Sequence, residues 1–261
     1  MSDGHSECWL FDLDGVVWLD GEPIPGVASA IGRVVASGRR VAYFTNNSFP
    51  RRADHLAKLR RAGLDAGDSD LLSSPEAAAG LCAAGERALV LGGPGVLEAL
   101  AARGVVAFDA GDEESGEGDV VVVGLDPRLD AARLARAARA VTRGARLLGT
   151  NDDATFPTPE GPIPGGGALL AAVAYATGAT PVVAGKPHPP SVELTIRRLG
   201  LPALVVGDRP STDGALARGL GCRFALVHSG VTPAGHGPLD PEPDVEAADV
   251  SELVAALLGP E

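Results

Sequence analysis

The chain has 261 residues, of which 45% are hydrophobic and 21% charged, and its formal net charge is −12. This composition is typical of a globular protein with a sizeable core, either one large domain or a core with a smaller domain. The negative charge argues against nucleic acid or an anionic membrane surface as a partner, so we expect neither.

The cysteines and the N-terminal residues bear on the compartment. Cys8, Cys82 and Cys222 are an odd number without paired spacing, which is typical of reduced thiols. The N-terminal residues show no basic region followed by an apolar stretch, and no apolar run reaches membrane-spanning length. We therefore expect a soluble cytoplasmic protein.

Short apolar runs alternate with amphipathic segments through most of the chain. The runs predict strands, in chain order, at residues 8–11, 41–44, 88–91, 120–123, 146–148, 203–206 and 224–227. The segments predict helices at 27–37, 51–62, 94–102, 131–142, 167–177, 190–199, 212–220 and 251–258. This alternation predicts an α/β fold with a Rossmann-like, doubly wound parallel sheet.

Glycine, proline and acidic residues mark irregular connections at 111–118, 157–167 and 232–243. The stretch between Thr45 and Lys186 is too long for one crossover, and its middle has its own alternating strands and helices. We therefore expect a core of residues 1–79 and 179–261, with an α/β domain of residues 80–178 inserted into it.

The segment from Cys8 to Gly21 (CWLFDLDGVVWLDG) places two carboxylates at the end of a predicted strand. Asp12 and Asp14 are two residues apart, so both side chains can leave the strand in one direction. Carboxylates this close repel unless a cation lies between them, and Mg²⁺ prefers such oxygen ligands. Taken alone, an ordinary strand followed by an Asp-Gly turn explains the segment about as well.

A second polar motif, Thr45 to Ser48 (TNNS), follows the next predicted strand and precedes a helix. Its hydroxyl, amide and backbone N–H groups suit an anion such as phosphate. Asn47 or Ser48 would also serve as a helix cap, and the two roles are compatible.

Two further motifs follow predicted strands. Lys186, one of only two lysines, lies between a glycine and a proline, where a cation beside carboxylates and phosphate explains it better than a helix-surface ion pair. The motif GDRPSTDG would bring Asp208 and Asp213 to the same crevice, or form an ordinary strand-to-helix turn. Open α/β sheets bind ligands at the carboxyl ends of their strands, so we expect the four motifs to form one site.

The series FDLDG, FTNNS, GKP and GDR-x-x-TD resembles the motifs of the haloacid dehalogenase superfamily of phosphohydrolases. The segments GTNDDATFP, G-x-x-PGGG and VHSGVT are similar to its NagD-like branch, which is related to 4-nitrophenyl phosphatases and phosphoglycolate phosphatases. The resemblance covers nearly the whole chain. It implies a Mg²⁺-dependent phosphatase that acts on a small phosphorylated metabolite, without specifying which one.

The resemblance implies a role for each motif residue in the reaction. Asp12 would be the nucleophile that forms an aspartyl phosphate, and Asp14 the general acid and base. Thr45 and Asn46 would hold the phosphate oxygens. Lys186 would offset negative charge on the nucleophile and on the transferring group, as phosphoryl transfer requires.

The same resemblance implies the metal ligands. Asp12, the backbone carbonyl of Asp14 and Asp208 would bind Mg²⁺, and Asp213 would support it through water. Pro210 and Ser211 stand where the family commonly has Leu-Asp, so one supporting carboxylate is missing.

The inserted domain would act as a cap that excludes water from the reaction. Asn151 and Asp153, at the end of a predicted strand of the cap, are the polar pair expected to approach the substrate. A loop-forming Asn-Asp turn is an equally good explanation. His188 and His228 lie near the motif loops, but no histidine has metal-ligand spacing, so none is assigned to the site.

Two alternative functions stay open at this point. The same core could serve a phosphotransferase or mutase, or the chain could be a non-catalytic module that binds a phosphorylated metabolite. The intact set of Asp12, Asp14, Lys186 and Asp208 favours an enzyme. The oligomeric state is also open, with a homodimer through the cap as one option.

Overall fold

The computed structural model describes residues 7–112, 118–158 and 160–260. Most of the connection expected at 111–118 lies outside these residues. The chain divides into two compact units, described separately here. The first comprises residues 1–45, 56–72 and 192–261, and the second residues 46–55 and 73–191. The second unit is wider than the segment 80–178, whose assignment as an inserted cap stays a prediction.

The first unit is built on a six-stranded sheet with the order β15-β14-β13-β1-β4-β5. In chain order these are β1 (Cys8–Phe11), β4 (Arg40–Thr45), β5 (Leu71–Ser73), β13 (Leu204–Gly207), β14 (Arg223–Val227) and β15 (Val245–Ala247). The central strand β1 pairs in parallel with β4 and β13, and β14 pairs in parallel with β13 and β15. All residues of β1 and β13 are buried, as expected for parallel strands covered on both faces.

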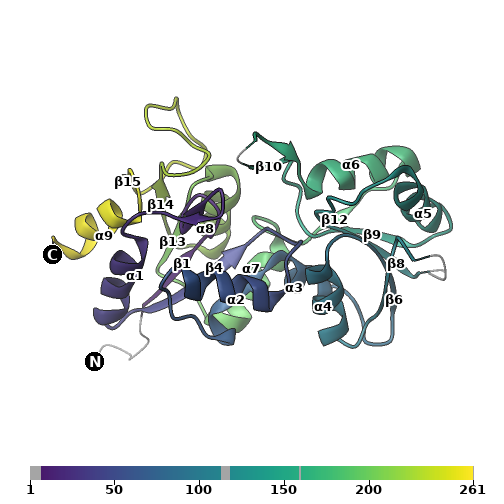
Figure 1. The fold of residues 1–261 in the computed structure, drawn as a ribbon, viewed down its shortest axis with the longest axis horizontal. Helices are drawn as coiled ribbons and strands as arrows, with labels where there is room; N and C mark the ends of the chain where they lie inside the picture. Colours follow the sequence, from purple (N-terminus) through teal and green to yellow (C-terminus); the bar gives the residue numbers. More distant parts are fainter. Residues whose placement is uncertain (1–6, 113–117, 159, 261) are drawn as a thin grey trace. The chain divides into compact units, whose positions relative to one another are not determined.

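Helices cover the sheet of the first unit. These are α1 (Val27–Ala36), α8 (Ala215–Leu220) and α9 (Val250–Leu258), while α2 (Arg52–Arg61) and α7 (Pro189–Leu199) cross the border between the units. α1 and α9 lie side by side (Figure 1), because Ile31 and Val34 of α1 share one apolar core with Leu253 of α9. A short hairpin, β2 (Trp18–Leu19) and β3 (Glu22–Pro23), follows β1.

The second unit contains a five-stranded parallel sheet with the order β12-β9-β8-β6-β7. Its strands are β6 (Arg87–Leu91), β7 (Val106–Asp109), β8 (Val120–Val123), β9 (Arg146–Gly149) and β12 (Val182–Val183), and its helices are α3 (Ser74–Ala79), α4 (Pro94–Ala102), α5 (Ala131–Thr142) and α6 (Gly166–Thr177). α5 and α6 lie side by side (Figure 1) over an apolar core that includes Val121 of β8. A small antiparallel hairpin, β10 (Thr155–Phe156) and β11 (Ile163–Pro164), precedes α6.

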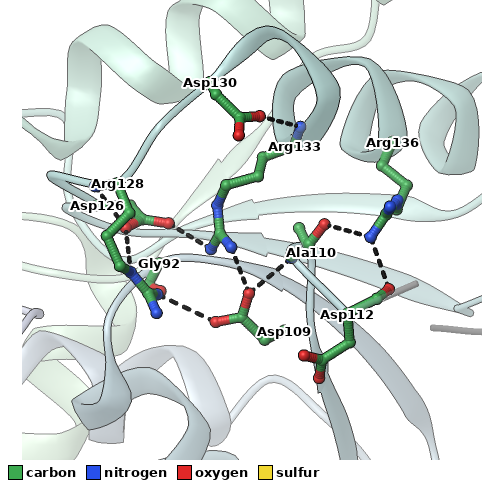
Figure 2. Close-up of polar contacts among 10 residues, drawn as sticks. Gly92, Asp109, Ala110, Asp112, Asp126, Arg128, Asp130, Arg133 and Arg136 are labelled. Carbon is green, nitrogen blue, oxygen red and sulfur yellow. Dashed lines mark hydrogen bonds and ion pairs between the residues drawn. The ribbon is translucent and has the colours of Figure 1, made fainter. Parts of the chain in front are cut away.

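Charged side chains link α5 to the ends of two strands in the second unit (Figure 2). Arg133 of α5 bridges Asp109, at the end of β7, and Asp126, which follows β8. Arg128 donates to the same two carboxylates at 3.0 Å each. The side chain of Asp126 is fully buried and that of Arg133 is 8% exposed, so these ion pairs are largely shielded from water.

The predicted α/β class with parallel sheets is confirmed, and strands form at all seven predicted positions. The helix expected at 212–220 instead begins as a π-helical turn at Pro210–Gly214, before α8. β5, β7 and β15 were not predicted, because they are edge strands of three or four residues with weak apolar signals. In the part of the chain that the structure describes, no helix has the length and apolar character needed to cross a bilayer.

Candidate active site

Three carboxylates meet in the first unit at the ends of two neighbouring strands. Asp12 directly follows β1, Asp208 directly follows β13, and Asp213 lies in the π-helical turn Pro210–Gly214. One carboxylate oxygen from each residue lies within 4.8 Å of the others. Asp208 and Asp213 are 3% and 1% exposed, so neighbouring negative charges are held here with little water to screen them. Such a group of hard oxygen donors fits Mg²⁺, whose charge would offset the repulsion.

Two glycines and a backbone amide fix the carboxylate of Asp208. Its Oδ2 accepts a hydrogen bond from the backbone N–H of Val231 at 2.6 Å. A Cβ atom at Gly15 or at Gly230 would overlap this same oxygen, and Gly15 has φ of +84°, which favours glycine. The Asp-Gly pair after β1 therefore serves the site, because only glycine lets the backbone approach Asp208 this closely.

The π-helical turn brings Asp213 back toward the end of β13. The backbone N–H of Arg209 donates to Asp213 Oδ2 at 3.3 Å. A Cβ atom at Gly207 would overlap the Asp213 side chain, so this glycine also allows a close approach. Single π-helical turns often occur at functional sites, and here the turn aims a buried carboxylate at two others.

The side chain of Asp14 has a different partner. Among the described residues, the group of converging carboxylates comprises Asp12, Asp208 and Asp213, and the Asp14 carboxylate is outside it. Asp14 Oδ1 accepts a hydrogen bond at 2.9 Å from the indole N–H of Trp18, which is 1% exposed. The metal contact expected of Asp14 was through its backbone carbonyl, and it stays a prediction.

Trp18 and Lys58 were not assigned to the site from the sequence. Lys58 Nζ lies 3.8 Å from the centre of the Trp18 ring, a cation–π contact. Burial lowers the pKa of Lys58, and the nearby negative charge of Asp14 partly offsets this effect. The sequence signal for this role was a tryptophan four residues after Asp14. Trp18 both packs in the apolar core and positions Asp14.

In the second unit, Asn46 joins the expected phosphate, cap and lysine motifs. Its side-chain N–H groups donate to Asp153 Oδ2 and to the Lys186 carbonyl, each at 3.1 Å, and its Oδ1 accepts from the Lys186 backbone N–H at 3.0 Å. The Asn46 carbonyl accepts from Asn151 Nδ2 at 2.7 Å and from the Ser74 hydroxyl at 2.9 Å. Both amide N–H groups of Asn46 have protein partners, and its expected contact with phosphate stays a prediction.

Asn151 and Asp153 line a hollow of about 30 Å³ in the second unit, together with Asn46 and Phe156. Asn151 is 3% exposed, and its Oδ1 accepts from the backbone N–H of Asp153 at 3.2 Å. This bond is the local Asn-Asp turn that the sequence left open. Contact of either residue with substrate stays a prediction, as does the role of Lys186, which is 2% exposed.

Three other polar residues near the motifs are buried or hydrogen-bonded. Thr45, at the end of β4, is fully buried. The Ser48 hydroxyl is also buried and accepts from the backbone N–H of Leu125 at 2.9 Å, and Ser48 lies four residues before α2 begins at Arg52. His188 Nε2 lies 2.8 Å from Asp152 Oδ2, and this hydrogen bond raises the pKa of His188, although burial acts in the opposite direction.

Comparison with known proteins gives a consistent result. A family model described as haloacid dehalogenase-like hydrolase matches residues 9–106, and a second, described as HAD-hydrolase-like, matches residues 183–253. A D-glycerol 3-phosphate phosphatase of Mycobacterium tuberculosis is 35% identical over 87% of this chain, which spans 64% of that protein. An acid sugar phosphatase of Staphylococcus saprophyticus is 33% identical, over 87% of this chain and 88% of that protein.

Solved structures agree with these relatives. A p-nitrophenyl phosphatase from Archaeoglobus fulgidus has a TM-score of 0.86 and 30% identity, covering 97% of this chain and 99% of that chain. A glycerol phosphate phosphatase from Mycobacterium tuberculosis in complex with magnesium has a TM-score of 0.84 and 32% identity, covering 95% of this chain and 76% of that chain.

Proposed function

The chain belongs to the haloacid dehalogenase-like hydrolases, as a phosphatase of their NagD-like branch, and we propose that it hydrolyses a small phosphomonoester with Mg²⁺ through an aspartyl phosphate on Asp12. The observation that carries the proposal is the convergence of Asp12, Asp208 and Asp213 within 4.8 Å at adjacent strand ends. These residues would hold Mg²⁺, which the magnesium complex of a structural neighbour also supports. When bound, the ion would offset negative charge on the transferring phosphoryl oxygens.

In the first step, a carboxylate oxygen of Asp12 attacks phosphorus as the bond to the ester oxygen breaks. The leaving alkoxide takes a proton from the Asp14 carboxyl group. The hydrogen bond from Trp18 holds Asp14 Oδ1 in place and leaves Oδ2 for this transfer. We assign neutralisation of the phosphoryl oxygens to Lys186 and to the backbone N–H groups that follow β4.

In the second step, water attacks the phosphorus of the aspartyl phosphate. Asp14, now ionised, accepts a proton from this water, and the bond between phosphorus and the Asp12 oxygen breaks. Inorganic phosphate leaves, and both aspartates return to their starting states. The two buried carboxylates, Asp208 and Asp213, do not exchange protons in this scheme.

The substrate we propose is a phosphorylated polyol or sugar. Relatives named for glycerol phosphate and acid sugar phosphates support this class. In the second unit, the hollow beside Asp153 is lined by polar groups and by the ring of Phe156. A carboxylate near the leaving group favours hydroxyl-bearing substrates over those with further carboxylates.

The proposal is tested by phosphate release from a panel of metabolite phosphates and from 4-nitrophenyl phosphate. We expect turnover with Mg²⁺, none in excess chelator, and no restoration by Ca²⁺, whose longer bonds and higher coordination number misplace the nucleophile. Asp153→Ala should change the ranking of substrates while turnover of 4-nitrophenyl phosphate stays within about tenfold. Metabolite binding without turnover under every metal condition would instead support a non-catalytic module.

A further inference from the structure

Two histidines and one glutamate converge in the first unit, outside the residues assigned to the reaction. His228 directly follows β14, His236 lies in the connection between β14 and β15, and Glu246 belongs to β15. The Nε2 atoms of His228 and His236 lie 3.1 and 3.0 Å from Glu246 Oε2. The two imidazole side chains are 12% and 18% exposed, so both are partly withdrawn from solvent.

The hydrogen-bond partner of Nδ1 in each imidazole shows which ring nitrogen carries the proton. His228 Nδ1 lies 3.2 Å from the Thr232 carbonyl, and His236 Nδ1 lies 2.6 Å from the Gly237 carbonyl. A carbonyl oxygen only accepts hydrogen bonds, so each Nδ1 is the protonated nitrogen. In the neutral rings, both Nε2 lone pairs then point toward a carboxylate oxygen. Three acceptors cannot satisfy one another, so the cluster needs a cation among them or an additional proton on each ring.

We propose that His228, His236 and Glu246 form a site for a divalent transition metal ion, with Zn²⁺ the best match. Two histidines and a glutamate are an established zinc donor set, which leaves a fourth position for water. Ligands at about 2.0–2.1 Å in a tetrahedral arrangement lie about 3.4 Å from one another. The observed separations of 3.0 and 3.1 Å from Glu246 need to change by only a few tenths of an ångström.

The hydrogen bonds to Thr232 and Gly237 fit this assignment. Metal-ligating histidines almost always donate their other ring N–H to a carbonyl or carboxylate, which fixes the ring orientation. Imidazole nitrogen suits zinc, copper, iron and nickel, whereas Mg²⁺ prefers oxygen ligands throughout. The histidine-containing cluster and the carboxylate group of Asp12, Asp208 and Asp213 therefore select different metals.

A metal at this site would restrain a long connection that also hydrogen-bonds to an active-site carboxylate. Residues 228–244 link β14 to β15 without a helix or strand of their own. Within this connection, the backbone N–H of Val231 donates to Asp208 Oδ2 at 2.6 Å, and the Ser229 hydroxyl donates to the Gly15 carbonyl at 2.7 Å. A metal that joins His228 and His236 to β15 would cross-link both ends of the connection, and so stabilise the segment that holds Asp208.

The test is a Co²⁺ titration of untagged protein that has been stripped of metal and then saturated with Mg²⁺ to fill the carboxylate group. We expect one Co²⁺ per chain, with visible absorption bands of a low-coordinate nitrogen and oxygen site that disappear when Zn²⁺ is added. His236→Ala and Glu246→Gln remove direct ligands, so each should weaken Co²⁺ and Zn²⁺ binding by at least about 100-fold. The matched controls His188→Ala and Glu242→Gln should bind as the unchanged protein does.

Hydrogen exchange supplies a second readout that does not depend on colour. Zn²⁺ should slow exchange of the backbone amides in 228–244 in the unchanged protein and in the controls, but not in His236→Ala. If a ligand variant does not fold, His236→Gln replaces it, because residue 236 lies on an irregular connection. Equal affinity in the unchanged protein and in the ligand variants would overturn the proposal. So would the absence of binding to the unchanged protein, which would make the cluster an ion pair of protonated histidines with Glu246.

Discussion

Arg133→Met tests how much the buried ion pairs of Arg133 contribute to the stability of the second unit. The guanidinium of Arg133 bridges Asp109 and Asp126 (Figure 2), and methionine keeps much of its apolar length while removing its charge and donors. The variant leaves two carboxylates with fewer partners, at the point where α5 meets the ends of β7 and β8. We therefore expect a loss of stability that exceeds the effect of altered packing alone.

The expected magnitude follows from burial and from the partners that remain. Breaking a buried ion pair by removing one side costs about 3–5 kcal/mol, because a charge is left without compensation. The Asp126 side chain is fully buried, but its Oδ1 keeps the backbone N–H of Arg128 at 3.1 Å and the Arg128 guanidinium at 3.0 Å. Asp109 keeps Arg128 and the backbone N–H of Gly111. We expect the lower end of the range, about 3 kcal/mol.

The assay is urea unfolding of the unchanged protein and of three variants. Arg139→Met makes the same substitution at an exposed position of α5 and should change the free energy of unfolding by less than about 0.5 kcal/mol. Combining Arg133→Met with Asp126→Asn should recover part of the loss, because it removes the uncompensated charge. Equal stability of the two methionine variants would refute the reasoning.

The same variant has a predicted pH dependence. Burial alone would raise the pKa of Asp109, but its hydrogen bond with Arg133, together with Gly111 and Arg128, holds that pKa below its ordinary value of 3.8. A lowered pKa in the folded state contributes stability above pH 3.8, and this contribution is lost as the pH falls through the folded-state pKa. The difference in stability between the unchanged protein and Arg133→Met should therefore shrink in acid. A difference that grows below this pH would contradict the assignment.

Three further predictions concern the site and its surroundings. Gly230→Ala places a Cβ atom against the buried carboxylate of Asp208, so we expect phosphate release at saturating Mg²⁺ to fall by about 100-fold. The control Gly237→Ala has open space around the new Cβ atom and should leave the rate unchanged. Asp14→Asn should slow unactivated esters by about two to four orders of magnitude and 4-nitrophenyl phosphate much less, and equal losses for both would rule out a proton donor. The pKa of His188, followed by NMR, should lie above 6.5 and return toward 6.5 in Asp152→Asn. The stability that this hydrogen bond contributes is full below pH 6.5 and is lost as the pH rises through the folded-state pKa. A pKa at or below 6.5 in the unchanged protein would exclude the bond.

The site residues at strand ends could be predicted from the sequence, because the order of the apolar runs and the parallel pairing of strands bring these residues to one edge of the sheet. Asp12 and Asp208 each follow a continuous apolar run, and parallel pairing of β1 with β13 brings the ends of these runs to one edge. Asp213 could be included because it belongs to the motif GDRPSTDG, which follows the same apolar run as Asp208. The details of its placement, a π-helical turn packed on Gly207, have no sequence periodicity and could not be foreseen.

The contacts that were missed join residues far apart in the chain through irregular segments. Asn46 bonds to Asn151 and Asp153 across more than a hundred positions, and its contact with phosphate stays a prediction. His228 and Glu246 meet His236 because a connection without helix or strand turns back on itself. The intervals between these three residues match no local metal motif, so a metal role for the histidines could not be predicted from the sequence.

The central claim is that Asp12 becomes covalently phosphorylated during turnover with Mg²⁺. The direct measurement is rapid acid quenching of enzyme in excess over substrate, followed by mass spectrometry of the peptide that contains residue 12. We expect this peptide to gain transiently the mass of HPO₃ with Mg²⁺. The gain should be absent in excess chelator and in Asp12→Asn, which should release almost no phosphate. Phosphate release by Asp12→Asn at the rate of the unchanged protein, or full turnover in chelator, would contradict it.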